Sequence, residues 1–196
     1  MKQILGVIIL FFLLVGCNSK PIDKYEELYL VVDEMIRFNY YDVDIVLLEL
    51  NQALYPQNDT LQRPGSIYYS KSMLQAWMNE DVLDSLDVAY FSFQMDSLEA
   101  YTLDPSRVNK PSLKFAAFKS WIEEYGVDST YQILEDKFDG NSLLRISSPL
   151  LSKGGDKMIL SIDYYCGRLC GSGVTYFLQK EGDEWGIVKT HHNWFN

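Results

Sequence analysis

Two cysteines near the C-terminal end are the residues in this chain best suited to chemistry. Cys166 and Cys170 lie four positions apart in the stretch SIDYYCGRLCGSGVTYF, a glycine-rich loop between two apolar runs. Three roles are open to them: a disulfide, a thiol-redox centre or part of a zinc site. The C-x3-C spacing differs from the C-x-x-C of redox motifs, and no helix begins there to lower a thiol pKa. These features favour a structural disulfide.

The histidines limit the metal chemistry that the chain can support. His191 and His192 are the only two, and they are adjacent. Neighbouring residues on a strand point to opposite faces of a sheet, so both side chains could not easily join the cysteines around one zinc ion. The glycines of the loop lack the G-x-G-x-x-G spacing and the following helix of a phosphate-binding loop. We therefore predict neither a metal site nor a bound cofactor.

One further pair of residues is a candidate for catalysis. If the cysteines flank a tight turn and Gly182–Asp183 forms a second one, the resulting register places Gly173 opposite both Asp163 and His192. The carboxylate and the imidazole could then approach each other across a residue without a side chain. Such a carboxylate orients a histidine or raises its pKa. No nucleophile motif accompanies Asp163 and His192, so a pair without catalytic function stays open as well.

The elements that must position these residues are helical in the first part of the chain. Apolar residues recur at helical spacing from Asp23 to Asn39, and Asp23 with Glu26 suits a capping box. The sequence also predicts helices at 43–55, where a strand is the alternative, and at 70–86. We expect a strand from Ala89 to Met95 because it is rich in aromatic residues. A last helix is expected from a Ser112 cap to a stop at Gly126.

From Ser142 the pattern changes to a period of two residues, which predicts strands separated by turns. In the derived register one face of these strands is apolar, whereas the other is mixed and is expected to be open. The fold class is therefore α+β, with N-terminal helices packed on a C-terminal antiparallel β-meander. Helices followed by long antiparallel strands are also similar to the NTF2-like cones.

The N-terminus has the features of an export signal. Lys2 precedes an apolar run from Ile4 to Val15 that is too short to span a bilayer. The following LVGC resembles the lipobox of bacterial lipoproteins, which implies cleavage before Cys17 and a diacylglycerol on that cysteine. We expect a signal peptide at 1–16, a lipidated tether at 17–22 and a single α+β domain at 23–196. Asn18 after the cysteine, rather than Asp, favours the outer membrane, and an oxidising envelope supports the disulfide.

Charge and a second resemblance narrow the function. The formal net charge is −10, which disfavours nucleic acid as a partner. The C-terminal stretch YYCGRLCGSGVTYFLQKEGDEWGIV resembles the ending of uncharacterised Bacteroidota lipoproteins with a C-G-x-x-C-G loop, and this resemblance implies no activity. We interpret the chain as a cell-envelope protein anchored in the membrane through Cys17 that binds an unknown protein or small molecule. The alternative is an envelope enzyme, hydrolase-like or thiol-dependent, that uses Asp163, His192 and the cysteine loop.

Overall fold

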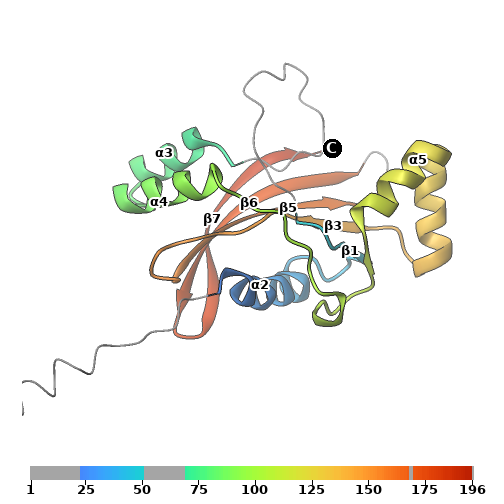
Figure 1. The fold of residues 1–196 in the computed structure, drawn as a ribbon, viewed down its shortest axis with the longest axis horizontal. Coiled ribbons are helices and arrows are strands. Elements are labelled where there is room, and N and C mark those ends of the chain that lie inside the picture. Colours follow the sequence, from blue (N-terminus) through green and yellow to red (C-terminus); the bar gives the residue numbers. More distant parts are fainter. Residues whose placement is uncertain (1–22, 51–68, 168–169, 196) are drawn as a thin grey trace, which may run out of the picture.

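The computed structural model describes residues 23–50, 69–167 and 170–195. Cys17, the predicted signal peptide and the predicted tether lie outside these residues. Within the described residues the fold is α+β, as predicted, and it combines a mixed sheet with helices on both of its faces (Figure 1).

Helices occupy the first two thirds of the described chain. They are α2 (Lys24–Phe38), α3 (Lys71–Asn79), α4 (Ser85–Met95), a 3-10 turn at Pro105–Arg107, and α5 (Phe115–Phe138). The predicted first helix is confirmed, and its N-cap Asp23 accepts a hydrogen bond from the Tyr25 backbone N–H at 2.9 Å. The cap satisfies one of the backbone donors that every helix start leaves free.

The described residues form a seven-stranded sheet with the order β2-β1-β3-β5-β6-β7, in which β4 also pairs with β5. The strands are β1 (Ile45–Leu47), β2 (Ser112–Leu113), β3 (Leu143–Ile146), β4 (Leu150–Leu151), β5 (Lys157–Tyr165), β6 (Gly171–Glu181) and β7 (Glu184–Phe195). The strands after residue 142 pair antiparallel, as predicted. The sheet is nevertheless mixed, because β1 pairs parallel with both β2 and β3.

Several predictions of local structure were wrong. The helix predicted at 70–86 is instead parts of two helices, because α3 ends at Asn79 and α4 begins at Ser85. The segment at 43–55 was predicted as a helix, but its first half contains strand β1, whose residues are all buried, so the strand alternative is confirmed there. Residues 51–55 lie outside the described residues. A central strand covered on both faces has a continuous apolar run, so its pattern does not alternate. The segment Ala89–Met95 is helical, because the capping box of Asp84 and Asp87 starts α4 just before it. Ser112 lies in β2 and caps nothing, and α5 begins after Lys114.

Gly126 interrupts α5 rather than ending it. Its φ of 78° and ψ of 170° are not helical, and the helix resumes on the far side and continues to Phe138. Glycine adopts this conformation without steric cost. The kink divides the predicted aromatic helix from a second helical segment that the sequence pattern did not indicate.

Helices cover both faces of the sheet. The second face, which was predicted to be open, is therefore covered as well. Figure 1 shows α2 below the sheet, α3 and α4 above one end of it, and α5 at the other end. The apolar face of the C-terminal strands packs on α2, with Leu160, Ile162 and Tyr176 in that core. On the other face Ile159 and Phe177 pack with α3 and α4, whereas the α5 core includes Ile45 and Leu143.

The register of the last three strands was predicted in part. Ile162 lies opposite Val174, and Leu178 lies opposite Ile187, as expected. Two irregularities between β6 and β7 then shift the pairing, so Tyr176 lies opposite Thr190 rather than Lys189. Each bulge adds a residue to one strand, which moves every later residue of β7 relative to β6.

Candidate functional site

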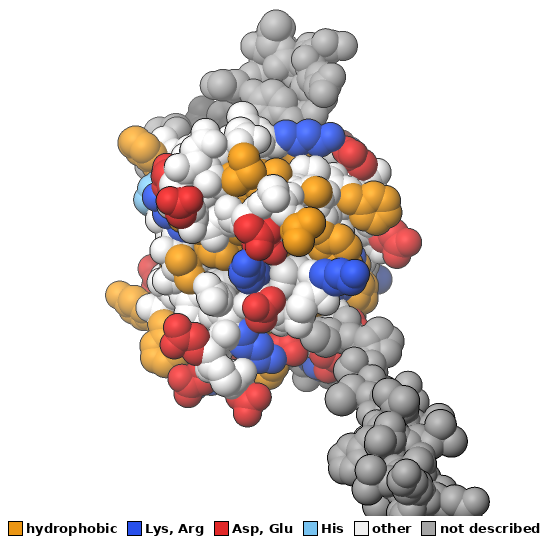
Figure 2. Space-filling view, turned by 90° about the vertical axis from the view of Figure 1, so that its left-hand side faces the viewer, with side chains coloured by type: hydrophobic (Ala, Val, Ile, Leu, Met, Phe, Trp, Pro, Cys, Tyr) orange, Lys and Arg blue, Asp and Glu red, His pale blue; other side chains and the backbone are white. Residues whose placement is uncertain are grey.

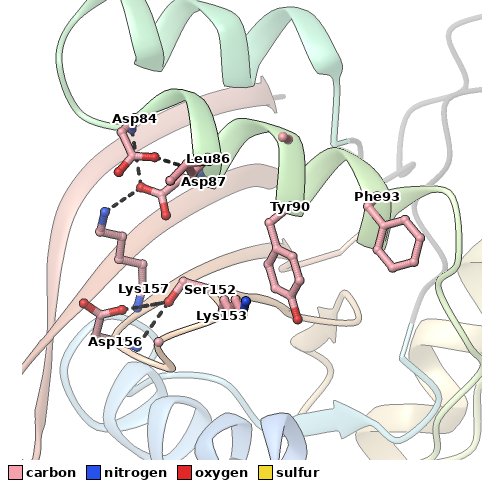
Figure 3. Close-up of a pocket in the computed structure, with 11 residues that line it drawn as sticks. Asp84, Leu86, Asp87, Tyr90, Phe93, Ser152, Lys153, Asp156 and Lys157 are labelled. Atoms are coloured by element: carbon pink, nitrogen blue, oxygen red, sulfur yellow. Dashed lines mark hydrogen bonds and ion pairs between the residues drawn. The ribbon is translucent and has the colours of Figure 1, made fainter.

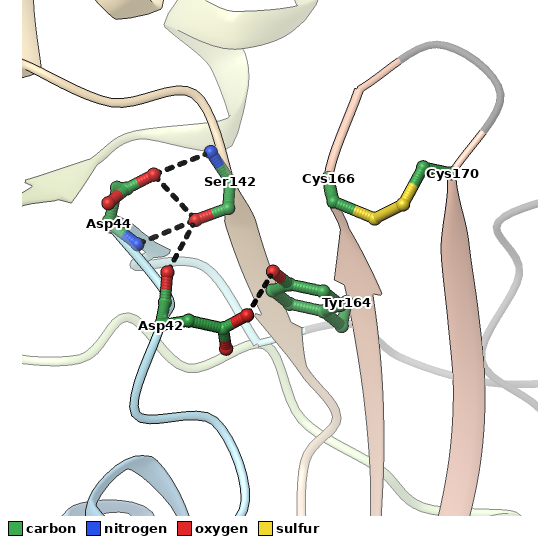
Figure 4. The surroundings of a disulfide bond; sticks show 6 residues. All are labelled: Asp42, Asp44, Ser142, Tyr164, Cys166 and Cys170. Atoms are coloured by element: carbon green, nitrogen blue, oxygen red, sulfur yellow. Dashed lines mark hydrogen bonds between the residues drawn. A yellow bond between two sulfur atoms is a disulfide. The ribbon is translucent and has the colours of Figure 1, made fainter.

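The cysteine loop forms a disulfide in the structure. Cys166 and Cys170 are joined across the tip of the β5–β6 hairpin, with their Cα atoms 5.1 Å apart (Figure 4). The backbone N–H of Cys166 also donates to the carbonyl of Cys170 at 3.1 Å. In this state neither sulfur is a thiolate, so the loop offers no nucleophile or metal ligand. The disulfide joins the end of β5 to the start of β6 and therefore has a structural role in this hairpin.

Beside the disulfide, polar contacts hold the start of β1 against the start of β3. Ser142 Oγ donates to Asp44 Oδ2 at 2.6 Å and accepts from the Asp44 backbone N–H at 2.8 Å (Figure 4). Tyr164 Oη donates to Asp42 Oδ2 at 3.0 Å. These carboxylates are occupied by neighbouring donors that fix the parallel β1–β3 pair. We assign them a structural role.

Asp163 is buried, and its partner is Trp194 rather than His192. The Trp194 Nε1–H donates to Asp163 Oδ1 at 2.9 Å, and Tyr165 Oη donates to Oδ2 at 3.4 Å. The hydrogen bond to Trp194 passes over Gly173, which lies opposite both residues in the ladder. Burial raises the pKa of Asp163 to about 6, while the Trp194 hydrogen bond and the charge of Arg145 oppose the shift.

His192 lies away from this carboxylate, so the predicted Asp163–His192 pair does not form. A bulge after Gly173 places His192 opposite Val174, and the Val174 side chain belongs to the core on the α2 side. Directly opposed residues share a face of the sheet, so His192 lies on the other face from Asp163. The predicted approach of Asp163 and His192 across Gly173 was therefore wrong, because Trp194 rather than His192 lies opposite Gly173.

The rest of the buried polar face is internally satisfied. Ser161 Oγ and Thr175 Oγ1 lie 2.5 Å apart, and Asn193 Nδ2 donates to Thr175 Oγ1 at 3.0 Å. Tyr69 Oη donates to the carbonyl of Ser148 at 2.7 Å. Every buried side-chain nitrogen or oxygen of the described residues has a hydrogen-bond partner. This network therefore leaves no free polar group directed at a ligand.

The surface groove beside α4 is the candidate site. It has a volume of about 530 Å³ and lies between α4 and the turn that joins β4 to β5 (Figure 3). One wall carries the apolar side chains of α4, of which Leu86 is 78%, Tyr90 39% and Phe93 67% exposed. Lys153 stands on the opposite wall. Ligand pockets span about 300–1,000 Å³ and are mostly apolar with a few polar groups, and this groove fits that description.

The groove exists because α4 is apolar on both of its sides. Phe91 and Met95 point inward, where they pack with Trp77 and Phe177 beneath the helix. The residues on the outer side have no such cover among the described residues. An amphipathic helix on a surface places polar residues there, so an outer apolar stripe usually marks a contact surface.

The charged side chains of the groove are mostly engaged within the chain. Lys157 forms an ion pair with Asp87. Asp84 Oδ1 accepts from the Asp87 backbone N–H at 2.7 Å, and Asp156 Oδ1 accepts from Ser152 Oγ at 2.8 Å (Figure 3). Lys153 is exposed and has no ion-pair partner among the described residues. It is the charge of this groove most available to a second molecule.

Sequence reasoning missed this groove because it predicted a strand at Ala89–Met95. Two signals in the chain could have revealed it. Asp84 and Asp87 are spaced as helix-starting residues, and the four outer positions recur at i, i+3, i+4 and i+7. Those positions are Leu86, Ala89, Tyr90 and Phe93.

Figure 2 views the side of the molecule that lies at the left of Figure 1, and there hydrophobic side chains gather among Lys, Asp and Glu side chains. An apolar centre with a mixed polar rim is the common composition of protein–protein interfaces.

The described residues contain no group of three or more His, Cys, Asp or Glu placed to hold a metal ion. None of their helices is both long and apolar enough to span a bilayer. No known protein family, curated protein or solved structure matches this chain.

Proposed function

We propose that this chain is a lipid-anchored cell-envelope protein that acts as a binding module through the α4 groove. The observation that carries the proposal is the exposed apolar stripe of α4 beside a cavity of about 530 Å³. Fully burying a Leu or Phe side chain contributes roughly 1.5–3 kcal/mol. Leu86 and Phe93 can therefore supply the energetic centre of an interface, together with the Tyr90 ring and Lys153, which has no ion-pair partner among the described residues.

The anchor in this proposal is the diacylglycerol on Cys17, which follows the signal-like run at Ile4–Val15. Two acyl chains hold a protein stably on a bilayer. Labelling of cells with an alkyne fatty acid should mark the wild-type chain and leave Cys17→Ala unmarked, with that variant in the soluble envelope fraction. Equal labelling of both chains would contradict the anchor.

The binding site is tested by photo-crosslinking in cells that export the full chain. A photoreactive phenylalanine analogue at Tyr90 or Phe93 should give a covalent adduct of higher mass after illumination. Tyr125 on α5 provides the matched control, because it is 49% exposed and lies outside the groove. The absence of adducts from both groove positions would refute the proposed site.

The alternative, an envelope enzyme, has one observation in its favour: the buried carboxylate of Asp163 with a pKa near 6. Perturbed carboxyl groups of this kind do occur in active sites. Asp163 and His192 lie on opposite faces of the sheet, however, and the cysteines are joined to each other. We therefore prefer the binding function.

A further inference from the structure

We infer that the occupant of the α4 groove is a second copy of this chain, with the two α4 helices packed antiparallel about a two-fold axis. The inference rests on the proposed binding function and names its partner. It follows from the order of the outer residues of α4, from the charges of the groove and from the tethering of every copy to one membrane surface.

The outer stripe of α4 is self-complementary. Its four members are Leu86, Ala89, Tyr90 and Phe93, and all of them line the groove. An axis that passes between Ala89 and Tyr90 places Leu86 of one copy opposite Phe93 of the other. The same axis places the Tyr90 ring over Ala89 of the second copy. Leu86 thus meets Phe93 and the Tyr90 ring meets a small residue, in an isologous contact in which the same patch serves both partners.

The dimensions of the stripe fit a helix–helix contact. With a rise of about 1.5 Å per residue, Leu86 and Phe93 lie about 10 Å apart along the axis of α4. Helices that pack through their side chains lie about 8–10 Å apart, and apolar residues at i, i+3, i+4 and i+7 form the ridge that such packing uses. The stripe lines one wall of the surface groove between α4 and the β4–β5 turn (Figure 3).

The charges of the groove agree with this occupant. α4 begins with Asp84 and Asp87, and no basic residue lies in its last turn. An antiparallel partner brings its acidic first turn alongside the C-terminal half of the helix that it contacts. Lys153 stands below α4 near Tyr90 (Figure 3), has no ion-pair partner among the described residues, and is available to a carboxylate of the second copy. Rim pairs of this kind set orientation more than affinity.

Anchoring makes a small contact sufficient. A stable interface in dilute solution buries about 800 Å² per partner, which is more than one two-turn stripe provides. Chains held on the same membrane surface by a short tether meet at a high effective concentration, and weak contacts are then populated. We therefore expect the dimer on membranes and at high protein concentration.

The test is disulfide trapping with two differently tagged full-length chains exported together. Leu86→Cys and Phe93→Cys replace exposed side chains, so both variants should fold. The mixed pair should form a covalent dimer at about tenfold the yield of either variant alone, because residues at the same end of the stripe lie beyond the roughly 7 Å Cα separation that a disulfide allows. Phe38→Cys, an exposed position on α2 outside the groove, is the control and should form none.

The outcomes separate this inference from the function on which it rests. A mixed dimer in clear excess supports the antiparallel second copy. Two results would overturn the inference and leave the binding function standing. In the first, all cysteine pairs form dimers equally. In the second, no pair forms a dimer, but Tyr90 still photo-crosslinks to a protein of different mass. If Tyr90 and Phe93 give neither dimers nor photo-adducts, both proposals fail.

Discussion

Replacing Gly173 with Ala should destabilise the protein far more than its small change in volume suggests. Gly173 lies on β6 beneath the hydrogen bond that joins Asp163 on β5 to Trp194 on β7. A Cβ added there would stand 2.5 Å from Asp163 Oδ1 and closer still to Trp194 Nε1. The methyl group and the hydrogen bond cannot occupy the same space, so one side chain must move away.

The expected loss of stability in Gly173→Ala is the sum of three contributions. A hydrogen bond to a charged group contributes about 1.5–3 kcal/mol, and its loss leaves the buried Asp163 carboxylate with one donor fewer. Forcing an extra methyl group into a packed site costs a further 1–3 kcal/mol or so. Alanine restricts the unfolded chain, which returns about 0.5–1 kcal/mol. We expect the free energy of unfolding to fall by roughly 2–5 kcal/mol.

Urea unfolding followed by circular dichroism measures this loss, and Gly186→Ala on β7 is the matched control. A Cβ at Gly186 meets nothing closer than the Gln179 carbonyl oxygen at 3.7 Å. In a Trp194→Ala background the cost of Gly173→Ala should shrink, because the contact that it disturbs is already gone. A Gly173→Ala loss within about 1 kcal/mol of the control, or full additivity with Trp194→Ala, would refute the reasoning.

Three further predictions concern pH, the disulfide and a partly buried ion pair. The pKa of Asp163 is about 6 in the folded protein, against the ordinary 3.8 of an aspartate. The folded state therefore binds the proton more tightly, and the Asp163 contribution to stability falls as pH rises from about 4 to 6. The unfolding free energy of Asp163→Asn relative to wild type should therefore rise by about 2 kcal/mol between pH 4 and pH 7, and equal differences at both values would contradict the burial argument. Reducing the Cys166–Cys170 bond, or replacing both residues with Ser, should cost about 2 kcal/mol in urea unfolding, because the closed loop is short. Glu27→Ala should lower the free energy of unfolding by about 2–4 kcal/mol in the same assay, because Lys180, whose side chain is 19% exposed, then loses its carboxylate partner. A loss under about 1 kcal/mol would mean that water replaces Glu27.

The sequence determined those elements whose own residues carry a complete local signal. Asp23 and the apolar stripe after it defined α2, and Gly182 with Asp183 defined the last hairpin. The two cysteines faced each other across a tight turn and formed the predicted disulfide. In each case the pattern depends on neighbours only a few positions apart, which a single sequence displays directly.

The strand wrongly predicted at Ala89–Met95, which lies in α4, shows a limit of prediction from local sequence patterns. Its aromatic residues favour strands by propensity, but the capping box of Asp84 and Asp87 and the packing of Phe91 and Met95 select a helix. The strand β1 was predicted as a helix, because its two faces are covered by α2, which precedes it, and by α5, which lies much later in the sequence. Burial on two faces removes the alternation on which strand prediction depends.

The candidate sites depended still more on tertiary structure. The alternation of β6 and β7 predicted that His192 would approach Asp163 across Gly173. The bulges between these strands instead place Trp194 opposite Gly173 and His192 on the other face of the sheet. A bulge of one residue reverses the face of everything beyond it, and no local signal in β7 announced it. The outer stripe of α4 was readable in the sequence, but only the packing of the opposite side of that helix decided which of its apolar residues would remain exposed.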